Sequence, residues 1–312
     1  MFFWSKSRPF EPEKDIPPLN GKVILVTGGN IGLGKQCVLE FARHRPAQIW
    51  LAARDLGKAQ AAADEIKQQV PDAPIKLLQL DLASFESVKK AAKIFSAESD
   101  RLDILMLNAG IMATPPGLTK DGYEIQFGTN HMGHALLTKL LLPVLEKTTK
   151  SVANTDVHIV SLSSRGHVYA PAGGFQFDTL KTTADSLGPF ARYGQSKLAN
   201  ILWARQLAKQ YPSFTVAAIH PGVVSTNLFA GATDAPLIFR IVFGGLNVLG
   251  LKSTVENGAR NQLWASVSED VQSGEYYDPV GVGGLASAYG KDDNLAKKIW
   301  DWTEEELGEH AA

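Results

Sequence analysis

The feature that most constrains the fold of this chain is a regular alternation of short apolar runs with longer helical segments. The runs are continuously apolar, which is typical of strands covered on both faces of a sheet. Strands that alternate with helices of about 12 residues or more predict parallel strands joined by crossovers. We therefore predict the α/β class, with one doubly wound sheet of about seven strands and helices on both faces.

The predicted strands are Lys22–Thr27, Gln48–Ala53, Ile75–Leu80, Asp103–Asn108, Val157–Ser163, Phe214–Ile219 and Glu275–Asp278. The predicted helices run from the end of the first glycine-rich turn to Arg45, over 55–69 and 84–97, over roughly 121–147 and 190–210, and near 254–267. No linker, repeat or low-complexity tract divides the chain. We expect a loosely held tail at 1–20, one domain over 21–290 with a loop insertion at 227–252, and a C-terminal helix and tail at 291–312.

A glycine-rich loop, TGGNIGLG, follows the first predicted strand and places glycines at 28, 32 and 34. One glycine permits a tight turn, a second lets the backbone approach a pyrophosphate, and a third lets the next helix pack closely on the sheet. The helix N-terminus then presents unpaired N–H groups to phosphates. A turn without a ligand is the alternative, but the place between a strand and a helix favours a dinucleotide-binding loop.

The end of the second predicted strand indicates which dinucleotide binds. An acidic residue there would select the ribose 2′-OH of NAD, but Ala53 is followed by Arg54, and arginine accommodates a 2′-phosphate. Lys35 adds positive charge, while Asp55 weakens the inference. The sequence favours NADP(H); a solvated charge at a helix start is the other interpretation of Arg54.

The stretch YGQSK places Tyr193 and Lys197 four residues apart in a predicted helix, so they share one face. A tyrosine hydroxyl has an ordinary pKa of about 10 and is a poor base at neutral pH. A nearby ammonium favours the phenolate and lowers the pKa of the phenol. We therefore predict Tyr193 as a general acid/base, with an amphipathic surface pair as the alternative.

Five motifs in this order resemble those of the short-chain dehydrogenase/reductase superfamily: TGGNIGLG, DL at 81–82, NAG at 108–110, YGQSK at 193–197 and HPGVVST at 220–226. The resemblance spans about residues 20–285. LNAGIM, TNHMGHALLT and YGQSKLANILWARQLA are most similar to the retinol-dehydrogenase-like NADP-dependent reductases. The resemblance implies a Rossmann-fold catalytic domain that interconverts a carbonyl compound and its alcohol by hydride transfer.

The resemblance also implies roles for single residues. Asn130 matches an asparagine that kinks its helix and holds a water for proton relay, although a purely local helix break is the other interpretation. Ser164, with Ser163 as the alternative, matches a serine that stabilises charge on the substrate oxygen. Lys197 also holds the ribose hydroxyls. The implied catalytic residues are Asn130, Ser164, Tyr193 and Lys197.

The cofactor contacts follow in the same way. Asp81 is expected to bond the adenine amino group, Asn108 to Gly110 to line the adenosine ribose, and Val224 with Thr226 to contact the nicotinamide amide and the phosphates. The expected cofactor-binding residues are Gly28, Ile31, Gly32, Leu33, Gly34, Lys35, Arg54, Asp81, Leu82, Asn108, Ala109, Gly110, Tyr193, Lys197, Val224 and Thr226.

Composition excludes several classes of function. The net charge of -1 gives no electrostatic reason to expect a nucleic-acid partner. Cys37 is the single cysteine, so no disulfide forms within the chain, and a reducing, cytoplasmic compartment is expected. His131 and His134 lie three apart, but no carboxylate cluster joins them or the other histidines, and hydride transfer needs no metal. We predict no metal site.

The segment 227–252 is long and apolar, which favours a lipophilic ketone, aldehyde or alcohol as the substrate. Its part at 236–251 is too short to span a membrane; a buried or lid helix is one interpretation, and peripheral contact with a membrane or lipid surface is another. Preference for NADPH favours reduction. A homodimer that pairs through the long helices is left open. The alternative function is a catalytically silent NADP-binding interaction protein.

Overall fold

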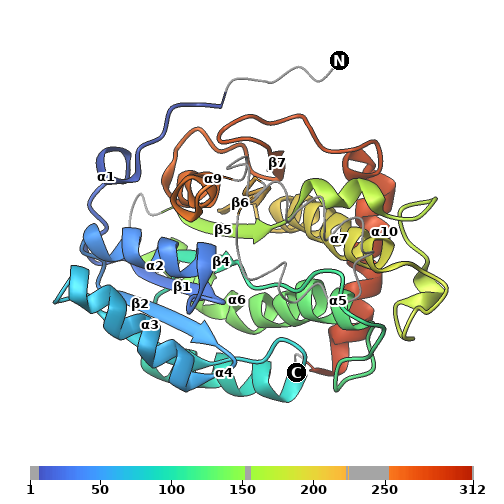
Figure 1. The fold of residues 1–312 in the computed structure, drawn as a ribbon, viewed down its shortest axis with the longest axis horizontal. Coiled ribbons are helices and arrows are strands. Elements are labelled where there is room, and N and C mark those ends of the chain that lie inside the picture. The colour runs from blue at the N-terminus through green and yellow to red at the C-terminus, as the bar shows by residue number, and fades with distance from the viewer. Residues whose placement is uncertain (1–6, 152–155, 223, 225–252, 311–312) are drawn as a thin grey trace.

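The computed structural model describes residues 7–151, 156–222, 224 and 253–310, and it is built around a seven-stranded sheet (Figure 1). All neighbouring strands pair in parallel, in the order β3-β2-β1-β4-β5-β6-β7. The strands are β1 (Val23–Thr27), β2 (Gln48–Ala53), β3 (Ile75–Gln79), β4 (Ile104–Leu107), β5 (Val157–Leu162), β6 (Phe214–Ile219) and β7 (Glu275–Tyr277). The predicted doubly wound α/β fold is confirmed.

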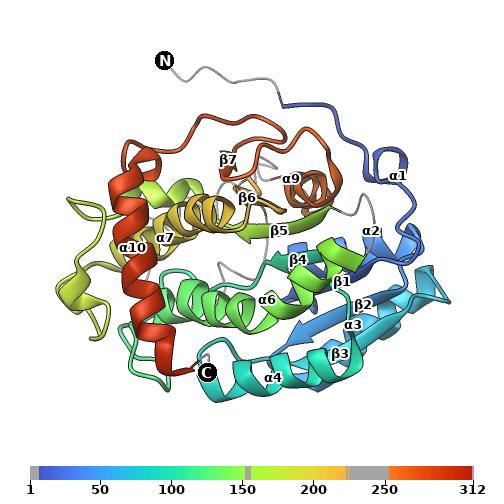
Figure 2. The same cartoon turned by 180° about the vertical axis from the view of Figure 1, so that it is seen from behind.

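Helices cover both faces of the sheet, as the two opposite views show (Figures 1 and 2). The apolar core beneath one face includes α2 (Gly32–Arg43), α3 (Leu56–Gln69) and α9 (Val255–Val267). The core beneath the other face includes α4 (Phe85–Glu98), α6 (Gly133–Ser151), α7 (Pro189–Gln210) and α10 (Asp293–Leu307). Because both faces are covered, β1, β4 and β5 are buried along their whole lengths.

Several helices begin where a side chain caps the first turn. Asp55 accepts from the backbone N–H of Lys58 at the start of α3, and Asp292 accepts from those of Asn294 and Leu295 at the start of α10. In contrast, α2 follows Ile31, which supplies no side-chain cap. The first N–H groups of α2 therefore remain available to a ligand.

The long helix predicted over roughly 121–147 contains a π-helical turn. The structure has a short turn of helix, α5 (Ile125–Phe127), then a π-helical turn, η1 (Gly128–Met132), and then α6. The Asn130 side chain bonds both backbone groups of Ile111, which holds the turn out of the regular helical path. The structure thus has the predicted helix from 125 onward, with an irregular turn at Asn130, where the sequence led us to expect a kink.

Both ends of the described chain pack against the domain. Phe10, Ile16 and Leu19 are buried beside α2 and α9, so the segment 7–20, with its helical turn α1 (Pro12–Asp15), is packed rather than loosely held. At the other end, α10 packs across α7 (Figure 2). Short 3-10 turns complete the chain: η2 (Arg165–Tyr169), η3 (Phe177–Thr179), η4 (Tyr289–Lys291) and η5 (Gly308–His310). Within the described residues, no helix has the length and apolar character to cross a bilayer.

Candidate active site

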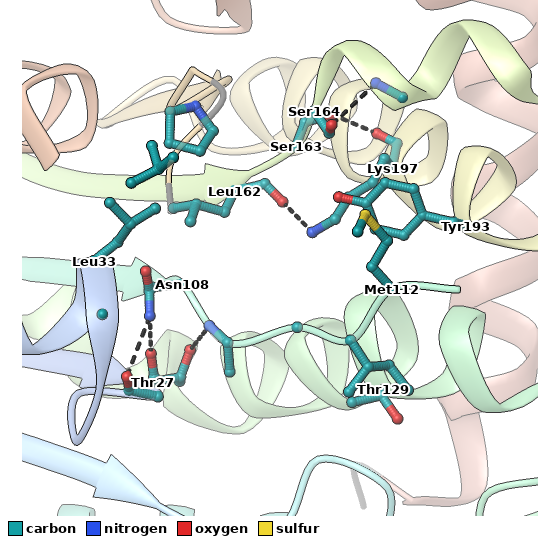
Figure 3. Close-up of a pocket in the computed structure, with 18 of the residues that line it drawn as sticks. Thr27, Leu33, Asn108, Met112, Thr129, Leu162, Ser163, Ser164, Tyr193 and Lys197 are labelled. Carbon is teal, nitrogen blue, oxygen red and sulfur yellow. Dashed lines mark hydrogen bonds between the residues drawn. The ribbon is translucent and has the colours of Figure 1, made fainter. Parts of the chain in front are cut away.

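A cavity of about 1330 Å³ lies at the carboxyl ends of the strands (Figure 3). The strand order reverses between β1 and β4, which is where doubly wound sheets bind their ligands. Pockets for a single small ligand are typically about 300–1,000 Å³, so this cavity has room for more than one. Among its lining residues are Gly28, Ile31, Gly32, Leu33, Arg54, Asp81, Leu82, Asn108, Ala109, Gly110, Ser164, Tyr193, Lys197 and Val224.

The glycine-rich loop forms one wall of the cavity. Gly28 and Gly32 have φ angles of 66° and 55°, in the left-handed region that glycine adopts without strain. A Cβ atom on Gly34 would lie 2.3 Å from the carbonyl oxygen of Gly28. Gly34 therefore allows α2 to approach the loop closely, as the spacing predicts, and it contributes through packing rather than by lining the cavity.

The segment after β4 is tied to the end of β1. The Asn108 side-chain amide donates to the carbonyl oxygen of Thr27 at 2.8 Å, and the Ala109 N–H donates to Thr27 Oγ1 at 3.0 Å (Figure 3). These bonds bridge the two strands at which the order reverses. They hold 108–110 beside the glycine-rich loop, where the expected ribose contacts would be.

Two cations line the end of the cavity next to β2. Arg54 follows the strand directly, and Lys58 lies one turn later on α3. Neither side chain has an ion-pair partner among the residues that the structure describes. Lys35 differs from expectation, because its ammonium pairs with Glu65 of α3 and it does not line the cavity. Thr226, the last expected contact, lies outside the described residues.

Ser164, Tyr193 and Lys197 lie together on the opposite wall (Figure 3). Ser164 follows β5, and its hydroxyl is near enough to Tyr193 to lower the pKa of the phenol. Lys197 Nζ lies 5.8 Å from the centroid of the Tyr193 ring and donates to the carbonyl oxygen of Leu162 at 2.8 Å. The hydroxyl of Ser163 instead donates to the backbone oxygen of Lys197 at 2.7 Å. Of the two serines, Ser164 is therefore the one whose hydroxyl contacts the phenol.

The electrostatics of this group differ from the sequence-based expectation of an acidic phenol. Burial raises the pKa of Tyr193 to about 12, and the nearby hydroxyl of Ser164 only partly opposes this shift. Burial also lowers the pKa of Lys197 to about 7. Desolvation therefore sets the direction of both pKa shifts. At neutral pH Tyr193 keeps its proton.

Asn130 lies behind this wall and is 0% exposed. Its Oδ1 accepts from the Ile111 N–H at 2.8 Å, and its Nδ2 donates to the Ile111 carbonyl oxygen and to Ser196 Oγ, each at 2.9 Å. The side-chain amide therefore joins the segment after β4 to helix α7. The hydroxyl of Ser196 in turn donates to the carbonyl oxygen of Tyr193 at 2.7 Å.

The first turn of α7 is held by a buried ion pair that the sequence did not reveal. Arg192 Nη1 donates to Glu124 Oε1 at 3.1 Å, and Nη2 donates to the Thr114 carbonyl oxygen at 2.9 Å. Arg192 and Glu124 are 0% and 1% exposed. Removing one member of such a pair leaves a buried charge without its partner, which is strongly destabilising. Arg192, which directly precedes Tyr193, therefore ties the start of α7 to Thr114, in the segment after β4.

The cavity beyond Tyr193 is apolar. Met112, Phe190 and Leu285 line it together with Val168 and Tyr169, which are each 59% exposed. Five apolar or aromatic side chains around one opening favour an apolar ligand. These residues come from four separate segments of the chain, so no single motif could have indicated them.

Within the described part of the chain, no group of three or more potential metal ligands occurs, and two of the histidines are buried and hydrogen-bonded. Burial lowers the pKa of His131 to about 3 and that of His134 to about 4, so both are neutral. Each bonds a threonine hydroxyl at 2.9 Å, Thr303 for His131 and Thr27 for His134.

Sequence reasoning overlooked Lys58, Ser196 and Arg192. A signal existed for the first two, because Lys58 is i+4 from Arg54 on a predicted helix and Ser196 belongs to the YGQSK motif itself. No local signal marks Arg192, because its partner Glu124 is 68 residues away.

Comparison with known proteins agrees with this site. A family model described as short chain dehydrogenase matches residues 22–176. A short-chain dehydrogenase/reductase from Aspergillus calidoustus is 40% identical over 94% of this chain and 95% of its own length. Retinol dehydrogenase 13 from Homo sapiens is 37% identical over 90% of this chain and 82% of its own length.

Solved structures of similar fold include an uncharacterized protein from Mycobacterium Paratuberculosis, with a TM-score of 0.73 and 30% identity over 96% of this chain and 98% of that one. A short chain dehydrogenase from Escherichia coli CFT073, solved in complex with NADPH, has a TM-score of 0.62 and 21% identity over 83% of this chain and 97% of that one. The second likeness supports the fold alone.

Proposed function

This chain belongs to the short-chain dehydrogenase/reductase family, as an oxidoreductase that acts on CH–OH groups, and from that premise we propose that it uses NADPH to reduce a lipophilic aldehyde or ketone. The observation that carries the proposal is the meeting of Ser164, Tyr193 and Lys197 on the cavity wall that faces the glycine-rich loop. The side chains that a carbonyl reduction needs therefore border the same space as the loop suited to a dinucleotide.

The residues present fit a nicotinamide dinucleotide. The uncapped N-terminus of α2 and the close approach that Gly34 permits provide backbone N–H groups for a pyrophosphate. When bound, the reduced cofactor supplies the hydride that reaches the carbonyl carbon. Tyr193 donates its proton to the carbonyl oxygen, and the hydroxyl of Ser164 orients that oxygen. The raised pKa of Tyr193 suits this direction, because the phenol stays protonated at neutral pH.

The preference for NADPH rests on Arg54 and Lys58. Both line the cavity next to the end of β2, where a ribose 2′-phosphate would lie, and no acidic residue replaces Ala53 at the strand end. Asp55 is the nearby counter-charge, and its carboxylate caps α3 by accepting from the Lys58 N–H at 3.0 Å.

We expect Arg54→Gln to weaken NADPH binding about 10- to 100-fold while NADH binding changes little, since one charged contact to the 2′-phosphate is lost. Lys58→Gln is expected to act in the same direction, and Lys35→Gln to leave the ratio of the two dissociation constants unchanged, because Lys35 pairs with Glu65. Titration of cofactor fluorescence measures all three variants. Equal losses for NADPH and NADH in Arg54→Gln would contradict the assignment.

The apolar opening around Met112, Val168 and Phe190 supports a lipophilic substrate. A retinol dehydrogenase among the relatives agrees with that class. The test is the oxidation of NADPH with a series of aldehydes and ketones of increasing apolar size, retinal and medium-chain aldehydes included, against small polar carbonyl compounds. We expect kcat/KM to rise with the apolar surface of the substrate.

Two results would count against the proposal. Higher kcat/KM for polar sugars than for apolar carbonyl compounds would contradict the proposal that the substrate is lipophilic. Tight NADPH binding without turnover of any carbonyl compound or alcohol in the series would instead favour the alternative of a catalytically silent NADP-binding protein.

A further inference from the structure

His134 bonds two segments of the active site at once. Its Nδ1 lies 3.0 Å from the backbone oxygen of Asn130, in the π-helical turn, and its Nε2 lies 2.9 Å from Thr27 Oγ1, at the end of β1. The side chain is buried, with 3% exposed. It therefore connects the turn that carries Asn130 to the strand that leads into the glycine-rich loop.

The direction of each bond follows from the chemistry of the groups. A carbonyl oxygen only accepts, so Nδ1 carries the hydrogen and donates to Asn130. Because burial keeps the imidazole neutral, Nε2 has no hydrogen and accepts from the Thr27 hydroxyl. The Thr27 oxygen itself accepts from the Ala109 N–H at 3.0 Å. Both ring nitrogens of His134 and the hydroxyl of Thr27 therefore have hydrogen-bond partners.

The bonds continue through Asn130 to the catalytic helix. Asn130 Nδ2 donates to Ser196 Oγ, which donates to the carbonyl oxygen of Tyr193. The Asn130 Oδ1 accepts from Ile111 N–H, in the segment that borders the cavity. An unbroken series of buried hydrogen bonds thus runs from the nucleotide-binding strand, through His134 and Asn130, to the turn of α7 that bears Tyr193.

We propose that His134 is a positioning residue, which holds the turn carrying Asn130 at a fixed distance from the nucleotide-binding loop and thereby aligns Tyr193 with the cofactor. The inference rests on the proposed function, since it takes Tyr193 as the proton donor. His134 touches no substrate atom in this scheme and acts only through Asn130 and Thr27. Positioning of this kind matters because a misplacement of about 1 Å lowers rates as much as ~100-fold.

The chain contains a matched control for this role. His131 lies in the π-helical turn, three residues before His134, is also buried, and bonds a threonine hydroxyl at the same 2.9 Å, but that threonine is Thr303 of α10, which does not line the cavity. Loss of either bond leaves a buried polar atom without one partner. Only the His134 bond leads to the nucleotide-binding strand. We therefore expect the loss of either bond to lower Tm, but only the loss of the His134 bond to lower kcat as well.

The test compares His134→Leu with Thr303→Val. We expect His134→Leu to lower kcat about 10- to 100-fold, with the NADPH dissociation constant within ~3-fold of wild type. Amide hydrogen exchange at Ile111 is expected to accelerate in this variant, because the Asn130 side chain that protects it loosens. Thr303→Val is expected to lower Tm while kcat and Ile111 exchange stay at wild-type values.

His134→Asn provides a second variant that keeps a donor toward the Asn130 oxygen and loses the bond to Thr27, so its kcat should fall between those of wild type and His134→Leu. Wild-type kcat and wild-type Ile111 exchange in either folded variant would overturn the proposal. So would a Thr303→Val variant that loses as much kcat as His134→Leu. Hydrogen exchange is measured without cofactor or substrate, so it still reports on His134 if the wild-type protein turns over no carbonyl compound.

Discussion

Tyr193→Phe is expected to lower kcat about 1,000-fold while the protein stays folded, because general acid catalysis by one side chain contributes roughly 10²- to 10⁴-fold. The substitution removes the hydroxyl that contacts Ser164 and leaves the buried ring in place. NADPH binding should change little, since the loop that faces the phosphates is intact. Steady-state kinetics and a fluorescence titration of NADPH measure both quantities.

Tyr211→Phe is the control for this substitution. Tyr211 lies at the other end of α7, does not line the cavity, and is partly exposed. Its variant should keep wild-type kcat. If Tyr193→Phe retained more than about a tenth of the wild-type kcat, proton donation by Tyr193 would be refuted, because that loss is smaller than the general-acid range.

Lys197→Met is expected to abolish turnover and at the same time to raise the Tm at neutral pH by several degrees. The lysine is 5% exposed, and burial lowers its pKa from 10.5 to about 7. Holding an ammonium in this environment destabilises the folded state. Methionine has a similar shape and no charge, so the variant avoids that cost, while the loss of the hydrogen bond to the Leu162 oxygen offsets part of the gain.

The pH dependence of this gain has a defined sign. Above about pH 10.5 the lysine is neutral in both the unfolded and the folded state, and it adds no pH-dependent penalty. As the pH falls from 10.5 toward 7, the unfolded state binds the proton first, so wild-type stability decreases. Below about pH 7 both states are protonated and the penalty is constant.

The Tm difference between Lys197→Met and wild type should therefore grow as the pH falls from 10 to about 7 and then level off. Thermal unfolding at a series of pH values measures it. Lys209→Met, an exposed lysine of the same helix that pairs with Asp293, should show no such dependence. A Lys197→Met protein that is less stable than wild type at every pH would show that the lysine stabilises the fold.

Local sequence predicted the sheet well because most of its strands, β1, β4 and β5 above all, are continuous apolar runs, the pattern expected of strands buried on both faces. The glycine-rich loop was predictable for a similar reason, since only glycine fits at Gly28 and Gly34. The π-helical turn within the helix across 121–147 was not, because it depends on bonds from Asn130 to Ile111, 19 residues away. A tertiary contact of this kind leaves no trace in helical periodicity.

For charged side chains, too, the sequence showed which residues are present, and the structure showed their partners. The sequence indicated a cation at Arg54, and the structure places it on the cavity, whereas Lys35 turned out to pair with Glu65, 30 residues away. The direction of the Tyr193 pKa was also mistaken from sequence. Spacing in a helix shows that a lysine is near, but the depth of burial decides whether attraction or desolvation prevails.

By itself, the sequence determined the class of fold, the order of its elements and the motifs that surround the cavity, because these follow from periodicity and from residue types at neighbouring positions. Only the tertiary structure decided which serine meets Tyr193, how Lys197 is charged, and that His134 joins Thr27 across 107 residues. The reason is physical: hydrogen bonds and desolvation depend on distances in space, and those distances exist only once the crossovers have brought β1, α6 and α7 together.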